Sequence, residues 1–158
     1  AVQVVNVAIG TPETSEKRLT LAGSLTTTSD EQIEEYRQVG WLTSDHAERV
    51  TVPSFPLDRV LRDAGITRDF EVLIVDVEGQ EDEVLGSFDL DYWRPAMLIV
   101  ELADTHPDLA LRRTSDYGLH RALLDAGYWT AYKDAINTVL VRDAVADAAY
   151  GRNRAARA

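Results

Sequence analysis

The sequence predicts an α/β fold, in which a mostly parallel β-sheet ends in an antiparallel C-terminal hairpin. Two continuous apolar runs, residues 72–75 and 96–100, are typical of strands that are buried on both faces of a parallel sheet. Each run is followed by a helical pattern. Two strand-like segments, residues 129–132 and 138–141, then flank a turn at residues 133–137, which predicts the hairpin.

The first third of the chain predicts further strands. Residues 2–9 are rich in β-branched side chains and predict a buried strand that ends at Gly10. Residues 18–21 and 49–52 are also strand-like, and Pro53 is expected to break the second of them.

Capping signals and the spacing of apolar residues predict four helices. Ser29 followed by Gln32 fits a capping box, which satisfies free N–H groups at a helix start, and Gly40 can end that helix. Further helices are expected at residues 57–64, 80–88 and 115–127.

Composition limits the classes of function. A chain of 158 residues fits one domain, which we expect to span residues 1–141, with residues 142–158 as an Ala- and Arg-rich tail. The net charge of −11 argues against a nucleic-acid partner and against docking on anionic membranes. The sequence contains no cysteine, no apolar run long enough to span a membrane and no signal segment. Disulfides and thiolate metal sites are therefore excluded, and a cytoplasmic location is expected.

Acidic residues follow both apolar runs. Asp76 and Glu78 come after the first run, and Glu101 ends the second. Because ligands bind outside the carboxyl ends of the strands in open α/β sheets, we expect these three side chains at one ligand-facing rim. Clustered carboxylates can accept a proton, orient a hydroxyl or bind a cation. A structural alternative is that Asp76 or Glu78 only caps the next helix.

The histidines give weaker signals. His106 lies in the loop after Glu101, where it could serve general base chemistry, and the alternative is a solvated loop histidine. Asp104, in the same loop, has the same standing. His46, His106 and His120 do not show the spacing of a metal-binding pattern, and no metal site is assigned.

Several segments resemble the FkbM family of methyltransferases. These segments are Asn6-Val-Ala-Ile-Gly10, Leu57-Asp58-Arg-Val-Leu61, Asp76-Val-Glu78-Gly79-Gln-Glu81, Leu98-Ile-Val-Glu101, Gly127-Tyr128 and Asn137-Thr-Val-Leu-Val141. The similarity spans about residues 2–141.

The resemblance implies a partial class I methyltransferase fold, which is Rossmann-like, with the strand order 3-2-1-4-5-7-6. In that order residues 2–9 are strand 3, residues 72–76 strand 4 and residues 96–101 strand 5, and the hairpin supplies strands 6 and 7. It also implies methyl transfer from S-adenosylmethionine to a hydroxyl of a small-molecule acceptor, such as a sugar or another metabolite. The candidate catalytic residues are Asp76, Glu78, Glu101 and His106.

One part of the family pattern is missing. The nine glycines include no Gly-x-Gly pair, so the loop that brings the backbone close to the cofactor is absent, and no cofactor-binding residue is assigned. We therefore interpret the sequence as the C-terminal portion of a longer enzyme. Residues 2–9 would then lack neighbouring strands, and an unpaired strand can self-associate. The alternative function is a non-catalytic protein-interaction domain with a degenerate methyltransferase fold.

Overall fold

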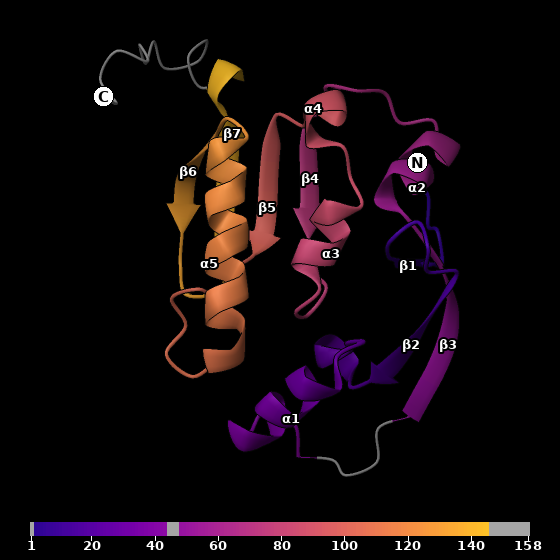
Figure 1. The fold of residues 1–158 in the computed structure, drawn as a ribbon, viewed down its shortest axis with the longest axis vertical. Coiled ribbons are helices and arrows are strands. Elements are labelled where there is room, and N and C mark those ends of the chain that lie inside the picture. The colour runs from indigo at the N-terminus through magenta and orange to yellow at the C-terminus, as the bar shows by residue number, and fades with distance from the viewer. Residues whose placement is uncertain (1, 44–47, 146–158) are drawn as a thin grey trace.

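The computed structural model describes residues 2–43 and 48–145 and shows a mixed α/β structure with two sheets (Figure 1). The larger sheet has the order β4-β5-β7-β6. Its strands are β4 (Val72–Val75), β5 (Met97–Glu101), β6 (Tyr128–Lys133) and β7 (Asn137–Arg142). β4 and β5 are parallel, and β7 is antiparallel to both β5 and β6. The two predicted apolar strands and the C-terminal hairpin are confirmed, in the order expected for these four strands.

One face of the larger sheet carries the main core. Leu98 and Val100 of β5 and Leu140 of β7 are fully buried on this face. They pack with Leu123 and Val84, which come from two of the three helices that cover the sheet. The covering helices are α3 (Glu81–Gly86), α4 (Leu90–Trp93) and α5 (Ala110–Asp125). The sheet is thus held by the hydrophobic effect acting mainly on one side.

β4 corrects the prediction that both apolar strands are buried on two faces. Val75 points into the core and is 3% exposed, whereas Val72 and Ile74 on the other face are 44% and 65% exposed. β4 ends the sheet order, so in the described parts of the chain it has a neighbouring strand on one side only. Continuous apolar sequence predicted the strand correctly but not how much of it is covered.

The smaller sheet corrects the prediction of a single sheet. It has the order β1-β3-β2 and consists of β1 (Ala8–Ile9), β2 (Glu16–Leu21) and β3 (Glu48–Phe55). The strand predicted over residues 2–9 is reduced to two residues, which pair in parallel with the end of β3. Val2 and Val4, before β1, are 93% and 85% exposed, because no described strand lies beside them.

Pro53 does not end β3, contrary to the prediction. It lies opposite Glu16, the first residue of β2, and the strand continues to Phe55. A proline is tolerated at this point because little of the hydrogen-bonded ladder lies beyond it on that side.

Two helices and a short 3-10 turn complete the described fold. They are α1 (Asp30–Gln38), α2 (Leu57–Asp63) and η1 (Gly23–Leu25). The side chain of Ser29 accepts a hydrogen bond from Gln32 N, which confirms the predicted N-cap of α1. Tyr36 of α1 packs with Ala103 and Leu109 in a second, smaller core. In Figure 1 the arrows of β4 and β5 point toward the side of the molecule where α1 lies.

The expected start of the tail at residue 142 is shifted, because Arg142 belongs to β7. The rest of the tail from residue 146 lies outside the described residues. None of the described helices has the length and apolar character needed to cross a bilayer.

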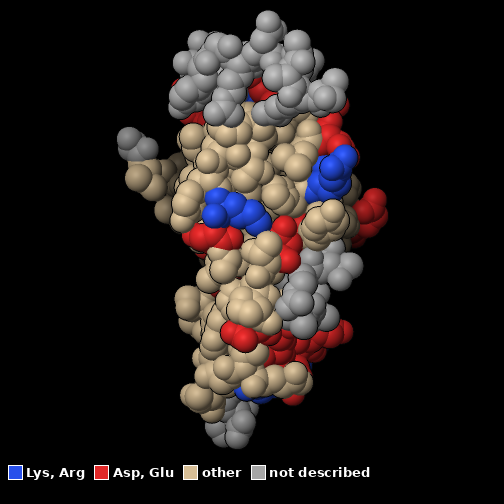
Figure 2. All heavy atoms as spheres, turned by 90° about the vertical axis from the view of Figure 1, so that its left-hand side faces the viewer, with Lys and Arg blue, Asp and Glu red and all other residues tan. Residues whose placement is uncertain are grey.

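Acidic residues are prominent on one face of the molecule (Figure 2). On the face drawn in Figure 2, Asp and Glu atoms are spread along the molecule, while Lys and Arg atoms form separate small patches. This distribution is the surface expression of the net charge of −11.

Candidate acidic site at the strand ends

Three carboxylates converge where β4 and β5 end. Val75 pairs with Val100 in the parallel register, so the residues that follow, Asp76 and Glu101, lie side by side at this end of the sheet. One carboxylate oxygen from each of Asp76, Glu78 and Glu101 lies within 4.8 Å of the others. Asp76 is exposed, Glu78 is half-buried and Glu101 is 8% exposed. The predicted convergence is confirmed, and the catalytic roles of these residues remain predictions.

The loop after β4 holds Glu78 in an unusual conformation. Glu78 has a φ of 53° and Gly79 a φ of 94°, so two consecutive residues lie in the left-handed region. The Thr27 hydroxyl donates to the Glu78 carbonyl at 2.8 Å, and the Tyr36 hydroxyl donates to Glu78 Oε2. A left-handed non-glycine residue costs free energy and persists where its surroundings fix it. The hydrogen bonds from Thr27 and from Tyr36 of α1 hold Glu78 in this conformation.

Glu81 is the internal support of the same loop. It is 1% exposed, and its Oε1 accepts hydrogen bonds from Val77 N at 3.2 Å and Gly79 N at 3.3 Å. Sequence reasoning did not assign it a role, although it belongs to the Asp-Val-Glu-Gly-x-Glu segment. Its position two residues after a tight turn was the available signal, since a carboxylate there can reach back to free N–H groups.

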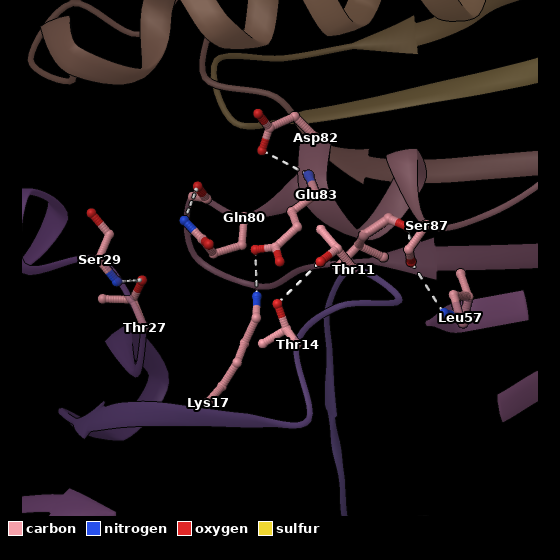
Figure 3. Close-up of polar contacts among 12 residues, drawn as sticks. Thr11, Thr14, Lys17, Thr27, Ser29, Leu57, Gln80, Asp82, Glu83 and Ser87 are labelled. Atoms are coloured by element: carbon pink, nitrogen blue, oxygen red, sulfur yellow. Dashed lines mark hydrogen bonds and ion pairs between the residues drawn. The ribbon is translucent and has the colours of Figure 1, made fainter. Parts of the chain in front are cut away.

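Gln80, and neither Asp76 nor Glu78, occupies the N-cap position of α3. The Gln80 side chain makes no capping hydrogen bond, and its amide donates instead to the Gly79 carbonyl at 2.9 Å (Figure 3). A capping role for Asp76 or Glu78 stays the structural alternative to a catalytic one.

A pocket of ≈ 270 Å³ lies beside Asp76. Lys17 of β2 lines this pocket and forms an ion pair with Glu83 of α3 (Figure 3). Both side chains are largely buried, so the pair ties the small sheet to α3. The lining consists of Val7, Ala8, Ile9, Lys17, Leu19, Thr26, Thr27, Thr28, Asp76, Val77, Gln80 and Val84.

His106 is not one of the three clustered carboxylate-bearing residues and lies in the loop after β5. It is 8% exposed, packs edge-on against Trp41 and accepts a hydrogen bond at Nδ1 from Asp108 N. The alternative of a solvated loop histidine is thus wrong, because the ring is buried. Its proposed general-base role stays a prediction.

Asp104 is part of a polar network between the loop after β5, α5 and β6. Its side chain is 4% exposed, lies at hydrogen-bond distance from His120 Nδ1 (3.3 Å) and forms an ion pair with the Lys133 ammonium. His120 Nε2 also contacts Thr130 Oγ1 at 2.8 Å. These contacts connect the loop after β5 to α5 and β6, which gives Asp104 a structural role.

The described glycines do not form a cradle for a cofactor. An ideal Cβ at Gly10 would meet Ser54 Oγ at 2.4 Å, and one at Gly79 would meet Gln32 Oε1 at 2.8 Å. Both glycines therefore allow the chain to pack against itself. No glycine lines the pocket beside Asp76. The incomplete cofactor site stays a prediction from the missing Gly-x-Gly pair.

The fold and the rim together define an α/β protein with acidic residues at the carboxyl ends of two parallel strands. The sequence profile of the methyltransferase FkbM domain matches residues 2–129, and the chain belongs to this family. Comparisons with curated proteins and with solved structures gave no significant match.

Proposed function

We propose that this chain forms the acceptor side of an S-adenosylmethionine-dependent methyltransferase that modifies a hydroxyl group of a small metabolite or sugar. The observation that carries the proposal is the convergence of Asp76, Glu78 and Glu101 within 4.8 Å at the ends of two parallel strands. Membership of the FkbM methyltransferase family supplies the reaction class.

The three carboxylates suit the acceptor half of the reaction. A hydroxyl oxygen must lose its proton as its new bond to carbon forms, and a positioned carboxylate can take that proton. The exposed Asp76 and the half-buried Glu78 are accessible for this step. The buried Glu101 can orient the hydroxyl by accepting its hydrogen bond, because much of such catalysis is positioning. S-adenosylmethionine would supply the methyl group.

A divalent cation is the alternative use of the same oxygens. Three carboxylates close together repel one another and favour a positive partner, and Mg²⁺ prefers oxygen ligands. A bound cation would lower the pKa of an acceptor hydroxyl. Loss of methyl transfer in EDTA and its recovery with Mg²⁺ would favour this alternative over direct proton transfer to a carboxylate.

We also propose that the larger sheet is part of a class I, Rossmann-like sheet. The order β4-β5-β7-β6 supports it, as does the open side of β4, where strand 1 of that fold would pair. In that fold the glycine-rich loop follows strand 1. A longer coding sequence with such a strand and loop upstream of residue 1 would agree with this part of the proposal.

The decisive experiment replaces the carboxylates in the full-length enzyme that contains this chain. Asp76→Asn and Glu78→Gln should each lower the transfer of labelled methyl groups into a small-molecule extract by about 100-fold or more, as expected for loss of a general base. Asp82→Asn, an exposed acidic residue on α3, is the matched control and should leave transfer unchanged. Wild-type turnover in both Asp76→Asn and Glu78→Gln would overturn the assignment.

A non-catalytic interaction domain is the second candidate, favoured by the exposed apolar side chains on β4. Calorimetry of this chain alone with S-adenosylmethionine should show weak or no binding, because the described residues form no glycine-lined cradle. Tight binding would contradict that expectation. Methyl transfer by the full-length protein would exclude the non-catalytic alternative.

A further inference from the structure

Trp41 is an exposed aromatic residue near the acidic rim. It follows α1, is 43% exposed and donates its backbone N–H to the Tyr36 carbonyl at 2.8 Å. Single exposed aromatic residues are common on protein surfaces, so exposure alone does not indicate a function. The argument for a function of Trp41 comes from the residues that surround it.

Two aromatic neighbours fix the orientation of the indole. Tyr36 stacks on it with ring centroids 5.8 Å apart and an interplanar angle of 23°. His106 meets it at 5.5 Å and 88°, and the backbone N–H of Asp108 donates to His106 Nδ1. Offset stacking and edge-to-face packing are the favoured arrangements of aromatic pairs. The structure therefore holds Trp41 in one orientation while leaving a large part of it open to solvent.

Tyr36 connects the indole to the carboxylates. It is fully buried, it stacks on Trp41 through its ring, and its hydroxyl donates to Glu78 Oε2. Trp41 thus lies one phenol ring away from Glu78, whose carboxylate belongs to the acidic cluster. An apolar aromatic surface and a set of hydrogen-bond acceptors are combined at the same end of β4 and β5.

We infer that Trp41 is a specificity-determining residue that stacks on the C–H face of a cyclic acceptor carrying several hydroxyls, such as a pyranoside. The inference rests on the proposed function and narrows its acceptor class. A pyranoside ring has one face of C–H groups that can lie on an indole, and its ring hydroxyls can donate to Asp76, Glu78 and Glu101. A planar phenol would use the indole but offers fewer donors to three carboxylates. An open-chain polyol offers the donors but no rigid face.

Saturation-transfer NMR on the whole chain tests this inference directly. The probes are the methyl glycosides of glucose, galactose, mannose and rhamnose, each without any methyl donor. Wild-type protein should transfer saturation to the ring C–H protons of at least one of them. Trp41→Ala should raise its dissociation constant about tenfold or more, the cost typical of losing a central aromatic contact. Trp41→Phe keeps an aromatic face and should retain part of the binding.

Tyr92→Ala is the matched control. Tyr92 is 41% exposed, nearly as much as Trp41, and it lies in α4, before the opposite end of β5. It should bind the glycoside like wild type. Thermal unfolding of each variant checks folding, and Trp41→Phe remains informative if Trp41→Ala does not fold.

Four outcomes would overturn the inference. The wild type could bind none of the four glycosides, or Trp41→Ala could bind the best glycoside as tightly as the wild type does. The wild type could also bind sorbitol as tightly as the best glycoside, or bind catechol more tightly than every glycoside. Because no methyl donor is present, glycoside binding that depends on Trp41 stands even if Asp76→Asn and Glu78→Gln leave methyl transfer intact, so the two proposals fail independently.

Discussion

Single side chains shape the loop that carries the candidate site. Glu81 is buried and accepts two backbone N–H groups, and Tyr36 and Thr27 hold Glu78 from outside the loop. Because a buried N–H group without a partner is costly, the contacts of Glu81 stabilise the backbone of this loop. The hydroxyls of Thr27 and Tyr36 hold Glu78 in place by donating to it. Asp76 and Glu78 depend on this support for their positions.

Glu81→Ala should lower the free energy of unfolding by about 1–3 kcal/mol, because it leaves the N–H groups of Val77 and Gly79 without their acceptor. Urea unfolding measures the change. Glu81→Gln keeps a carbonyl acceptor and should lose less. Asp82→Ala, at the exposed neighbouring position, is the control, and an equal loss there would show that Glu81 has no special role.

Asp58 connects the start of α2 to α4 and the residue before it. Its Oδ1 accepts hydrogen bonds from Trp93 Nε1 at 2.6 Å and Asp89 N at 3.0 Å. Burial alone would raise the pKa of this carboxyl. The hydrogen bonds from Asp89, Trp93 and Arg62, together with the charge of Arg62, outweigh burial and lower the pKa below its ordinary value of 3.8. The Leu57-Asp58 pair of the family pattern therefore has a structural use.

Asp58→Asn should be less stable than wild type near neutral pH by about 1–2 kcal/mol, because a hydrogen bond to a charged acceptor becomes one to a neutral acceptor. A carboxyl with a lowered folded-state pKa stabilises the fold above its ordinary value of 3.8 and loses that contribution as the pH falls through the folded-state pKa. The difference between the two proteins should therefore shrink below about pH 4. Denaturant unfolding from neutral to acidic pH measures it, and a constant difference would contradict the assignment.

At the scale of elements, the unit formed by β4, its loop and α3 must pack tightly against α1. Gly79 has a φ of 94°, and a Cβ there would lie 2.8 Å from Gln32 Oε1 of α1. The backbone conformation favours glycine, and an added Cβ would push the Gln32 side-chain amide aside. The position of α1 over the rim depends on this contact.

Gly79→Ala should destabilise the protein by about 1–3 kcal/mol through strain at a left-handed residue and the contact with Gln32. Gly86→Ala is the matched control, because Gly86 lies in the last turn of α3, has no positive φ and has no atom within 4 Å of an added Cβ. It should be neutral or slightly stabilising, as alanine favours helix. Thermal unfolding compares the two, and similar melting temperatures would refute the tight-packing argument.

The whole molecule leaves strand surfaces open. β4 has a described neighbour on one side only, and the β-branched segment before β1 is exposed at Val2 and Val4. Open strand edges with exposed apolar side chains favour pairing with another chain. The net charge of −11 opposes such pairing through repulsion, which salt screens.

We expect this chain to self-associate through β4 at near-physiological salt, in addition to the self-association that the sequence predicts for residues 2–9. Ile74→Lys should weaken the association, because a lysine on an edge strand discourages pairing. Tyr117→Lys is the control, since Tyr117 on α5 is equally exposed, at 65%. Sedimentation velocity over a range of concentrations measures the effect. A monomer at every concentration, or equal effects of the two variants, would show that β4 is not the contact.

Local sequence patterns predicted much of this structure. The apolar runs predicted β4 and β5, and the Ser29 signal predicted the start of α1. Asp76, Glu78 and Glu101 were found because parallel strands place their carboxyl ends together. Patterns of this kind depend on neighbours in sequence, which is why they can be read from the chain itself.

The sequence alone determined β4, β5, the C-terminal hairpin and the start of α1, and which carboxylates meet at the rim, because these follow from local periodicity and from strand direction. Tertiary structure alone decided that residues 8–9 join a second sheet, that Ile74 is exposed, and that Tyr36 contacts both Glu78 and Trp41. These features join residues far apart in the chain, and their free energies depend on which surfaces are left to cover one another. No local pattern contains that information.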